Sequence, residues 1–137
     1  MNNVNINDEE FKNTDTYKQF IKENPSQGHL RVKAFSASEA IPITGLKVVV
    51  SKTINNYNVV FFEGYTNDSG IINNIDLPAP KQNTNNLDAP LSTTYDIESS
   101  YDNINKKYII KIYDDVYVIQ NINVKPMIDM RGKFYGN

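Results

Sequence analysis

The side chains of this sequence that could do chemistry are mainly carboxylates. Asp96 and Glu98 alternate along one expected strand, so their carboxylates share a face, beside Asp114 and Asp115 in an expected turn. A glycosidase uses such a pair, but it needs the two groups about 5 to 10 Å apart in a cleft, with one pKa raised by burial. No pattern in the sequence indicates a cleft. We therefore interpret all four as solvated carboxylates and expect no catalytic residue.

Composition leaves little room for metal or thiol chemistry. The chain has no cysteine and a single histidine, His29, which excludes a disulfide, a thiol nucleophile and an all-imidazole metal site within one chain. The run Asn67-Asp68-Ser69-Gly70 offers oxygen ligands, yet Ca²⁺ needs about 6 to 8 of them and the EF-hand spacing is absent. We interpret this run as a turn in which Gly70 takes a positive φ. The sequence predicts no metal and no cofactor.

The other candidate site residues are apolar or aromatic and would bind a partner. Tyr17, Phe20 and Ile21 recur at helical spacing, which predicts a short amphipathic helix over 16–23, ended by Asn24-Pro25. Such a helix either covers an end or edge of its own domain or docks on a partner.

Tyrosines of the strand region add a second group of candidates. Most are expected at the edge of the core with the hydroxyl in water, whereas an exposed row would suit a protein interface or sugar stacking. The predicted partner-binding residues are Tyr17, Phe20, Ile21, Tyr95, Tyr101 and Tyr113.

Charge and hydropathy limit the partners further. The 137 residues carry 14 basic and 16 acidic side chains, interspersed, for a net charge of −2. This balance gives no footprint for nucleic acid, and no apolar run approaches the roughly 18 residues of a membrane span. The first residues lack the features of a secretory signal. We expect synthesis in the cytoplasm without a signal peptide, no membrane insertion, and a final location in a spore, envelope or virion particle.

From Gly28 onward, strand-like alternation replaces helical spacing. Seven short strands with no helix between them predict an all-β fold, a seven-stranded Greek-key β-sandwich preceded by a short N-terminal helix. The lack of crossover helices excludes a parallel sheet. We expect an arm over 1–27, the sandwich over 28–126 and a tail over 127–137. The segment 63–80 is predicted as a central hairpin, and 78–92 as a long surface loop.

Two motifs, taken in their order along the chain, resemble those of the transthyretin-like modules, which include the regulatory-like domain of carboxypeptidases and the B-type repeats of Gram-positive adhesins. They are Ile41-Pro42-Ile43-Thr44-Gly45-Leu46-Lys47-Val48 and Tyr65-Thr66-Asn67-Asp68-Ser69-Gly70. The later segments 75–80, 95–97 and 112–126 look like the non-catalytic amino-terminal domain of clostridial spore cortex-lytic and related cell-wall proteins. The resemblance covers about 28–126 and implies the role of a spacer or assembly module.

B-type adhesin repeats often carry a Lys–Asn isopeptide bond promoted by a buried acid. By position, the resemblance nominates Lys33, Asn121 or Asn123, and Glu98. However, Lys33 falls opposite the apolar face of its strand, and a lysine outside the core would not have its pKa lowered. We therefore do not expect the bond.

Two functions remain. The first is a non-enzymatic structural module that mediates protein–protein contacts, self-assembly included, in a bacterial spore, cell envelope or phage-like particle. The absent active site, the helix and the exposed edge strands of such sandwiches favour it. The alternative is a carbohydrate- or peptidoglycan-binding module that uses the 78–92 loop and the tyrosines.

Overall fold

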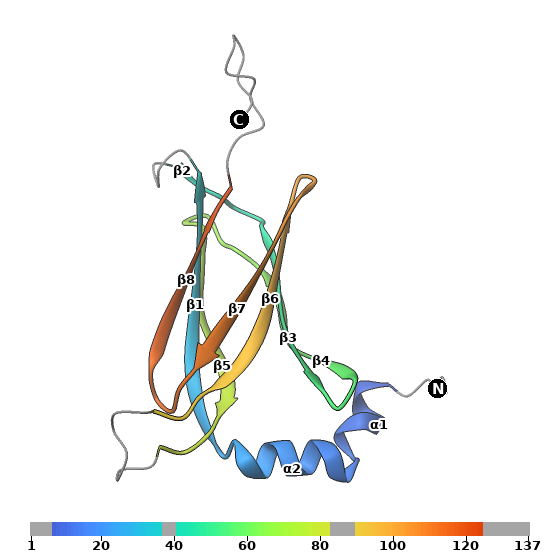
Figure 1. Cartoon of the computed structure of the whole chain (residues 1–137). Coiled ribbons are helices and arrows are strands. Elements are labelled where there is room, and N and C mark those ends of the chain that lie inside the picture. Colours follow the sequence, from blue (N-terminus) through green and yellow to red (C-terminus); the bar gives the residue numbers. More distant parts are fainter. Residues whose placement is uncertain (1–6, 37–40, 83–89, 125–137) are drawn as a thin grey trace.

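A computed structural model describes residues 7–36, 41–82 and 90–124 of the chain (Figure 1). Two short helices are followed by strands that form two sheets, so the chain is mostly β. The elements are α1 (Asp8–Lys12), α2 (Asp15–Glu23), β1 (Ser26–Ser36), β2 (Ile41–Pro42), β3 (Lys47–Ile54), β4 (Tyr57–Tyr65), β5 (Ile71–Ala79), β6 (Thr93–Tyr101), β7 (Ile104–Ile112) and β8 (Tyr117–Asn123). None of the helices in this described part is long and apolar enough to cross a membrane.

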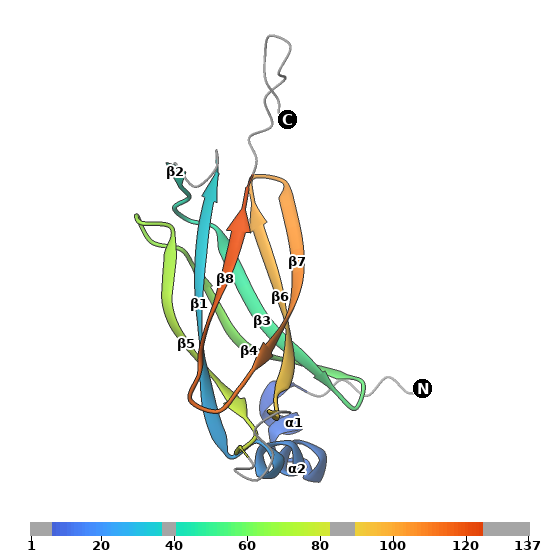
Figure 2. The same cartoon turned by 60° about the vertical axis from the view of Figure 1, so that its left-hand side comes forward.

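Strand β1 is the centre of the first sheet. It pairs antiparallel with β5 and with the short β2 on one edge, and parallel with β8 on the other edge. Figure 2 shows β8 beside β1 and running in the same direction. The second sheet has the order β4-β3-β6-β7 and is antiparallel throughout. Strands β8, β5, β4 and β7 therefore form the long margins of the two sheets.

The sequence analysis excludes a parallel sheet, and the first sheet is mixed, because β1 pairs antiparallel with β5 and parallel with β8. Parallel neighbours need a long crossover, and a helix is the usual one. Here the crossover between β1 and β8 contains the whole second sheet, which lies over the first sheet.

The predicted hairpin over 63–80 is also wrong. Strand β4 pairs with β3 in the second sheet and β5 pairs with β1 in the first, so the turn between them crosses from one sheet to the other. The Thr66 hydroxyl donates to the Ile43 carbonyl at 2.6 Å and accepts from the Leu46 amide at 3.0 Å. At the far end of the turn, the Gly70 carbonyl accepts from the Ala34 amide at 2.7 Å. These hydrogen bonds join residues that are distant in the sequence, and they determine the crossover. The local spacing of residue types does not predict them.

The turn itself forms as predicted. The side-chain oxygen of Asn67 accepts from the amides of Ser69 and Ile71 at 2.8 and 3.1 Å, and Gly70 has φ +76°. The side chain of Asn67 thus forms an Asx turn, which stabilises the change of direction.

Strand and helix counts differ from the prediction. The described residues form eight strands and two helices, where seven and one were expected. The additional strand is β2, whose two residues pair with Phe35 and Ser36. The additional helix, α1, begins at a capping box in which Asn7 and Glu10 satisfy each other's backbone amides. The predicted tail 127–137 lies outside the described residues.

The helices close one end of the sandwich, where α2 lies across the ends of both sheets (Figure 1). Phe11 stacks on Tyr57 at 4.3 Å between ring centroids, and Phe20 packs on Phe61 at 5.9 Å. Both phenylalanines belong to the core that the inner faces of the sheets form. The predicted helix therefore covers the end of its own domain in this structure.

Replacing a buried residue of α2 should reveal this packing. Phe20 is 7% exposed, so Phe20→Ala should lower the free energy of unfolding by about 3 kcal/mol through lost burial and a cavity. Ile21→Ala, at a residue 37% exposed on the same helix, should cost less than about 1 kcal/mol. Urea denaturation measures both. Equal losses would contradict the docking of α2.

The crossover turn should not tolerate a side chain at Gly70. A Cβ there would lie 2.4 Å from the Ala34 carbonyl oxygen, whereas Gly45, with a similar φ of +80°, has open space around it. Gly45→Ala should destabilise by about 1 kcal/mol through its left-handed backbone alone. Gly70→Ala should cost about 3 kcal/mol because the Ala34–Gly70 hydrogen bond must also give way. Thermal unfolding compares the two, and equal values would argue against the close approach.

Candidate interaction site

The six predicted partner-binding residues do not form one surface. Phe20 and Tyr95 are buried, and half-buried Tyr17 packs against Phe20 with 6.1 Å between ring centroids. Phe61 joins this group to Tyr95 at 5.4 Å. The Tyr95 hydroxyl donates to the Pro78 carbonyl of the opposite sheet at 2.5 Å, and burial raises the pKa of this hydroxyl. These three residues hold the molecule together and are not displayed for a partner.

The other three lie apart from one another. Ile21 is exposed on α2, and Tyr101 is a half-buried residue at the end of β6 that packs against the core. Tyr113 lines a small, open, mainly apolar recess of about 340 Å³ with Gln82, Pro90 and Val116.

The carboxylate pair lines a groove on the outer face of the second sheet. Asp96 and Glu98 share this face as predicted, and the groove of about 600 Å³ also contains Ser51, Thr53, Asn58 and Lys107. The groove is open to solvent, and Glu98 lies 3.8 Å from the ammonium group of Lys107. Asp114 and Asp115 do not join them, because they line a different hollow beside His29. The groove is a polar surface without a desolvated acid.

The isopeptide candidates do not meet in the core. Lys33 is exposed and lies opposite Asn121 in the parallel ladder, while Glu98 belongs to the second sheet and is also exposed. These positions therefore do not provide the buried lysine and buried acid that such a bond needs.

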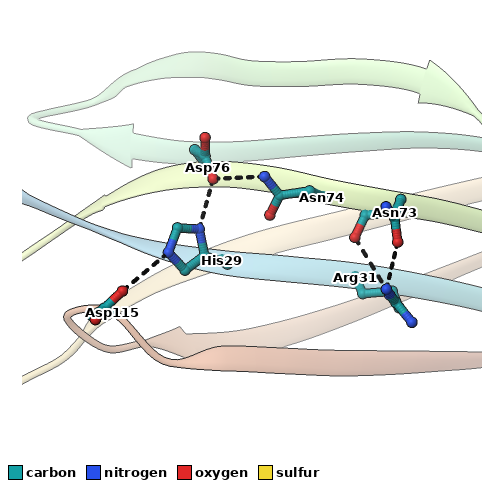
Figure 3. Close-up of polar contacts among 6 residues, drawn as sticks. All are labelled: His29, Arg31, Asn73, Asn74, Asp76 and Asp115. Carbon is teal, nitrogen blue, oxygen red and sulfur yellow. Dashed lines mark hydrogen bonds and ion pairs between the residues drawn. The ribbon is translucent and has the colours of Figure 1, made fainter.

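His29 is the centre of a polar cluster on the outer face of the first sheet (Figure 3). Its Nδ1 lies 2.7 Å from Asp76 Oδ1 on β5, and its Nε2 lies 3.5 Å from Asp115 Oδ1 in the turn between β7 and β8. The imidazole also stacks on Tyr117, the first residue of β8, at 4.3 Å. One side chain thus contacts two segments that are distant from it in the sequence, β5 and the turn that leads into β8.

The cluster continues along β5. Asn74 donates to Asp76 Oδ1 at 3.0 Å, and Arg31 donates to Asn73 Oδ1 at 2.5 Å. Two hydrogen bonds hold the pKa of Asp76 below its ordinary value: the bond with His29 has the larger effect and the bond from Asn74 the smaller. No three His, Cys, Asp or Glu side chains of the described residues gather to hold a metal ion.

Sequence reasoning missed this cluster. It predicts His29 as an exposed residue at the start of a strand, whereas the side chain is only 16% exposed. The cluster depends on the register of β1 on β5, which sets His29 opposite Asp76. That register cannot be predicted from the local periodicity of the sequence. The cluster fixes the position at which β8 starts, with the Val116 carbonyl accepting from the His29 amide at 3.0 Å.

Strand β8, which His29 anchors, exposes two large apolar side chains, Tyr117 at 68% and Ile119 at 59%, and Val116 just before the strand is 44% exposed. Two other margins expose one each, Ile109 of β7 at 75% and Tyr65 of β4 at 62%. Edge strands normally avoid such exposure, because their unpaired amides and carbonyls are a template for another strand.

The other three long margins carry the usual protection. Strand β7 contains Lys106, Lys107 and Lys111. Strand β5 contains Asp76 and Pro78 and has a bulge, and β4 contains Glu63 and also has a bulge. Strand β8 has no charged residue, proline or bulge over its seven residues. Among the described strands of comparable length, β8 is therefore the margin open to pairing.

Comparison with known proteins does not show to which family the chain belongs. No protein-family model matches it, and a search of curated proteins finds no match in sequence. Among solved structures, it is similar to (S)-allantoin synthase with a TM-score of 0.43 and 12% sequence identity, over 78% of this chain and 45% of that one. The chain thus spans less than half of that enzyme, and a likeness this low carries no argument about activity.

The charge of Asp76 should contribute to stability in a defined pH range. Because its folded pKa is lowered from 3.8, its contribution is fully present above about pH 4 and is lost as pH falls through the lowered value. Asp76→Asn keeps an acceptor for His29 but removes the charge, so its Tm should be below that of the wild type at pH 6. The two Tm values should converge as the pH falls from 3.8 through the lowered pKa of Asp76. A Tm difference that is constant across this range would contradict a role for the charge.

Proposed function

We propose that this chain is a non-enzymatic structural module that makes protein–protein contacts through strand β8. The observation that carries the proposal is the exposed, uncharged edge of β8, with Tyr117 and Ile119 projecting from its outer face. An edge of this kind accepts an extended strand from another chain, with backbone hydrogen bonds supplying affinity and side chains supplying specificity.

The arrangement of strands supports a finer assignment of the fold. A sheet of order β4-β3-β6-β7 facing one in which β1 lies between β5 and β8 is consistent with a Greek-key sandwich of the transthyretin-like type. The motif resemblance over 28–126 favours the same assignment. It is also the basis for proposing a bacterial spore, cell envelope or phage-like particle as the setting.

A carbohydrate- or peptidoglycan-binding module is the second candidate. The groove beside Asp96 favours it, because hydroxyl and amide groups of Ser51, Thr53 and Asn58 line it. Sugar-binding faces usually add an aromatic ring for stacking. Tyr108 lines the groove, but it is partly buried and packs against the core. We therefore prefer the assembly function.

A lysine on the open edge should separate the chain from its assembly. In the source organism, the tagged wild type should sediment with a high-mass fraction, namely spore, envelope or particle. Ile119→Lys should move most of the protein to the low-mass fraction, because an edge lysine opposes strand pairing. Ile119 is 59% exposed, so the substitution should leave the fold intact.

The matched control is Ile109→Lys, at a residue 75% exposed on β7, the margin that already carries lysines. This variant should sediment like the wild type. A wild-type chain found only in the low-mass fraction would overturn the assembly function.

A further inference from the structure

We propose that the strand that pairs with β8 is β8 of a second copy of this chain. The two strands run antiparallel about a two-fold axis at Gln120 and join the two first sheets into one continuous sheet. This inference rests on the proposed function and names the partner for the same edge.

The backbone of β8 has the alternation that this pairing needs. The ladder with β1 begins at the bond from the His29 amide to the Val116 carbonyl, 3.0 Å, and ends at the bond from the Val124 amide to the Phe35 carbonyl, 2.8 Å. In a strand, successive residues direct their backbone polar groups to opposite edges. Even-numbered residues of β8 therefore face β1, and odd-numbered residues direct both amide and carbonyl away from it.

A two-fold at Gln120 pairs all of these outward-directed groups. In the single chain the Asn121 carbonyl accepts from the side-chain amide of Gln120 at 2.9 Å, and pairing would replace that bond with one from the Ile119 amide of the other copy. This two-fold sets Tyr117 opposite Asn123 and Ile119 opposite Asn121 of the other copy, and each such pair exchanges two hydrogen bonds. All four odd-numbered residues of β8 are then paired. A two-fold at Ile119 would leave Asn123 unpaired, so the Gln120 register satisfies more of the edge.

Charge selects a second copy as the occupant. When a strand pairs with itself about a two-fold, charges of one sign on the strand are brought near charges of the same sign on its copy, and like charges across strands are destabilising. Strand β8 has no charge to oppose, whereas self-pairing of β7 would bring together two sets of three lysines. The net charge of −2 adds little repulsion between whole chains.

The side chains of the outer face fit the same arrangement. Tyr117 and Ile119, which are exposed in the single chain, would each lie beside a short, neutral asparagine of the other copy. The stacking of His29 on Tyr117 holds the start of β8 in place before pairing, which lowers the entropy lost on association.

Sedimentation of the purified full chain is the first test. The wild type should form a dimer, and Ile119→Lys should weaken association at least tenfold. Ile119→Glu should be weakened in the same way, while an equimolar mixture of the two variants should dimerise again, because opposite charges then lie on diagonal neighbours of the two strands, within reach of long side chains. Ile109→Lys should dimerise like the wild type. Restored association in the mixture also shows that both variants are folded.

Disulfide trapping tests the register, and the cysteine-free sequence makes single-cysteine variants unambiguous. Across the proposed two-fold, the two Gln120 residues form a non-hydrogen-bonded pair with Cα atoms about 4.5 Å apart, a separation that a disulfide can span. Gln120→Cys should therefore form a covalent dimer under mild oxidation. Asn105→Cys, at an exposed residue on β7, controls for random collision and should not.

The outcomes separate this inference from the function beneath it. A monomeric wild type that still sediments with its assembly in cells overturns the self-pairing and leaves the function in place. A monomer found in no assembly overturns both. A dimer that Ile119→Lys does not weaken, or that Ile119→Cys traps better than Gln120→Cys, overturns the pairing or its register.

Discussion

The pairing of β1 on both of its edges is the constraint on which the rest of the structure depends. Leu30, Val32 and Ala34 of this strand are fully buried, so its backbone groups have no water and need partners on both sides. Strands β5 and β8 supply them, one antiparallel and one parallel. Because the parallel partner cannot follow directly, the chain completes the second sheet before β8 is added to β1. Among the described strands the chain changes sheet four times, after β2, β4, β5 and β7.

A further consequence of two facing sheets is that the apolar space between them must be covered at its ends. Two facing sheets leave apolar side chains accessible at their ends, and α1 and α2 cover one end with Phe11 and Phe20. Tyr95 extends this aromatic group and bonds through its hydroxyl to the opposite sheet. The helical segment is therefore part of the same core as the strands, although it precedes them in the sequence.

The polar cluster around His29 connects the centre of the fold to its open margin. His29 is hydrogen-bonded to Asp76 on β5 and stacked on Tyr117, the first residue of β8. It therefore connects β5 and β8 across the outer face of the first sheet. It holds β8 in place without covering its outer edge. The margin that carries the proposed function is thus rigid at its start and unprotected along its length.

Local features of the fold follow well from the sequence. Alternation predicts most of the strands, with β6 over 93–101 as expected. Polar residues mark the turns: Asn55-Asn56 and Asp102-Asn103 both have positive φ at two successive residues, as the tight turn of a hairpin requires. The capping residues Asn7 and Thr14 begin the two helices. Each of these features depends on contacts within a few residues, and spacing reports such contacts directly.

What the sequence alone determined is therefore the all-β character, the positions of most strands and turns, and the carboxylate pair on one face. Only the tertiary structure decided which strands are neighbours. It turned the expected hairpin at 63–80 into a crossover, buried Phe20 and Tyr95 away from any partner, brought His29 to Asp76 and left β8 at a margin. The physical reason is that strand periodicity reports which face of a strand is buried. The strand at each edge depends on long-range hydrogen bonds, which leave no periodic trace in the sequence.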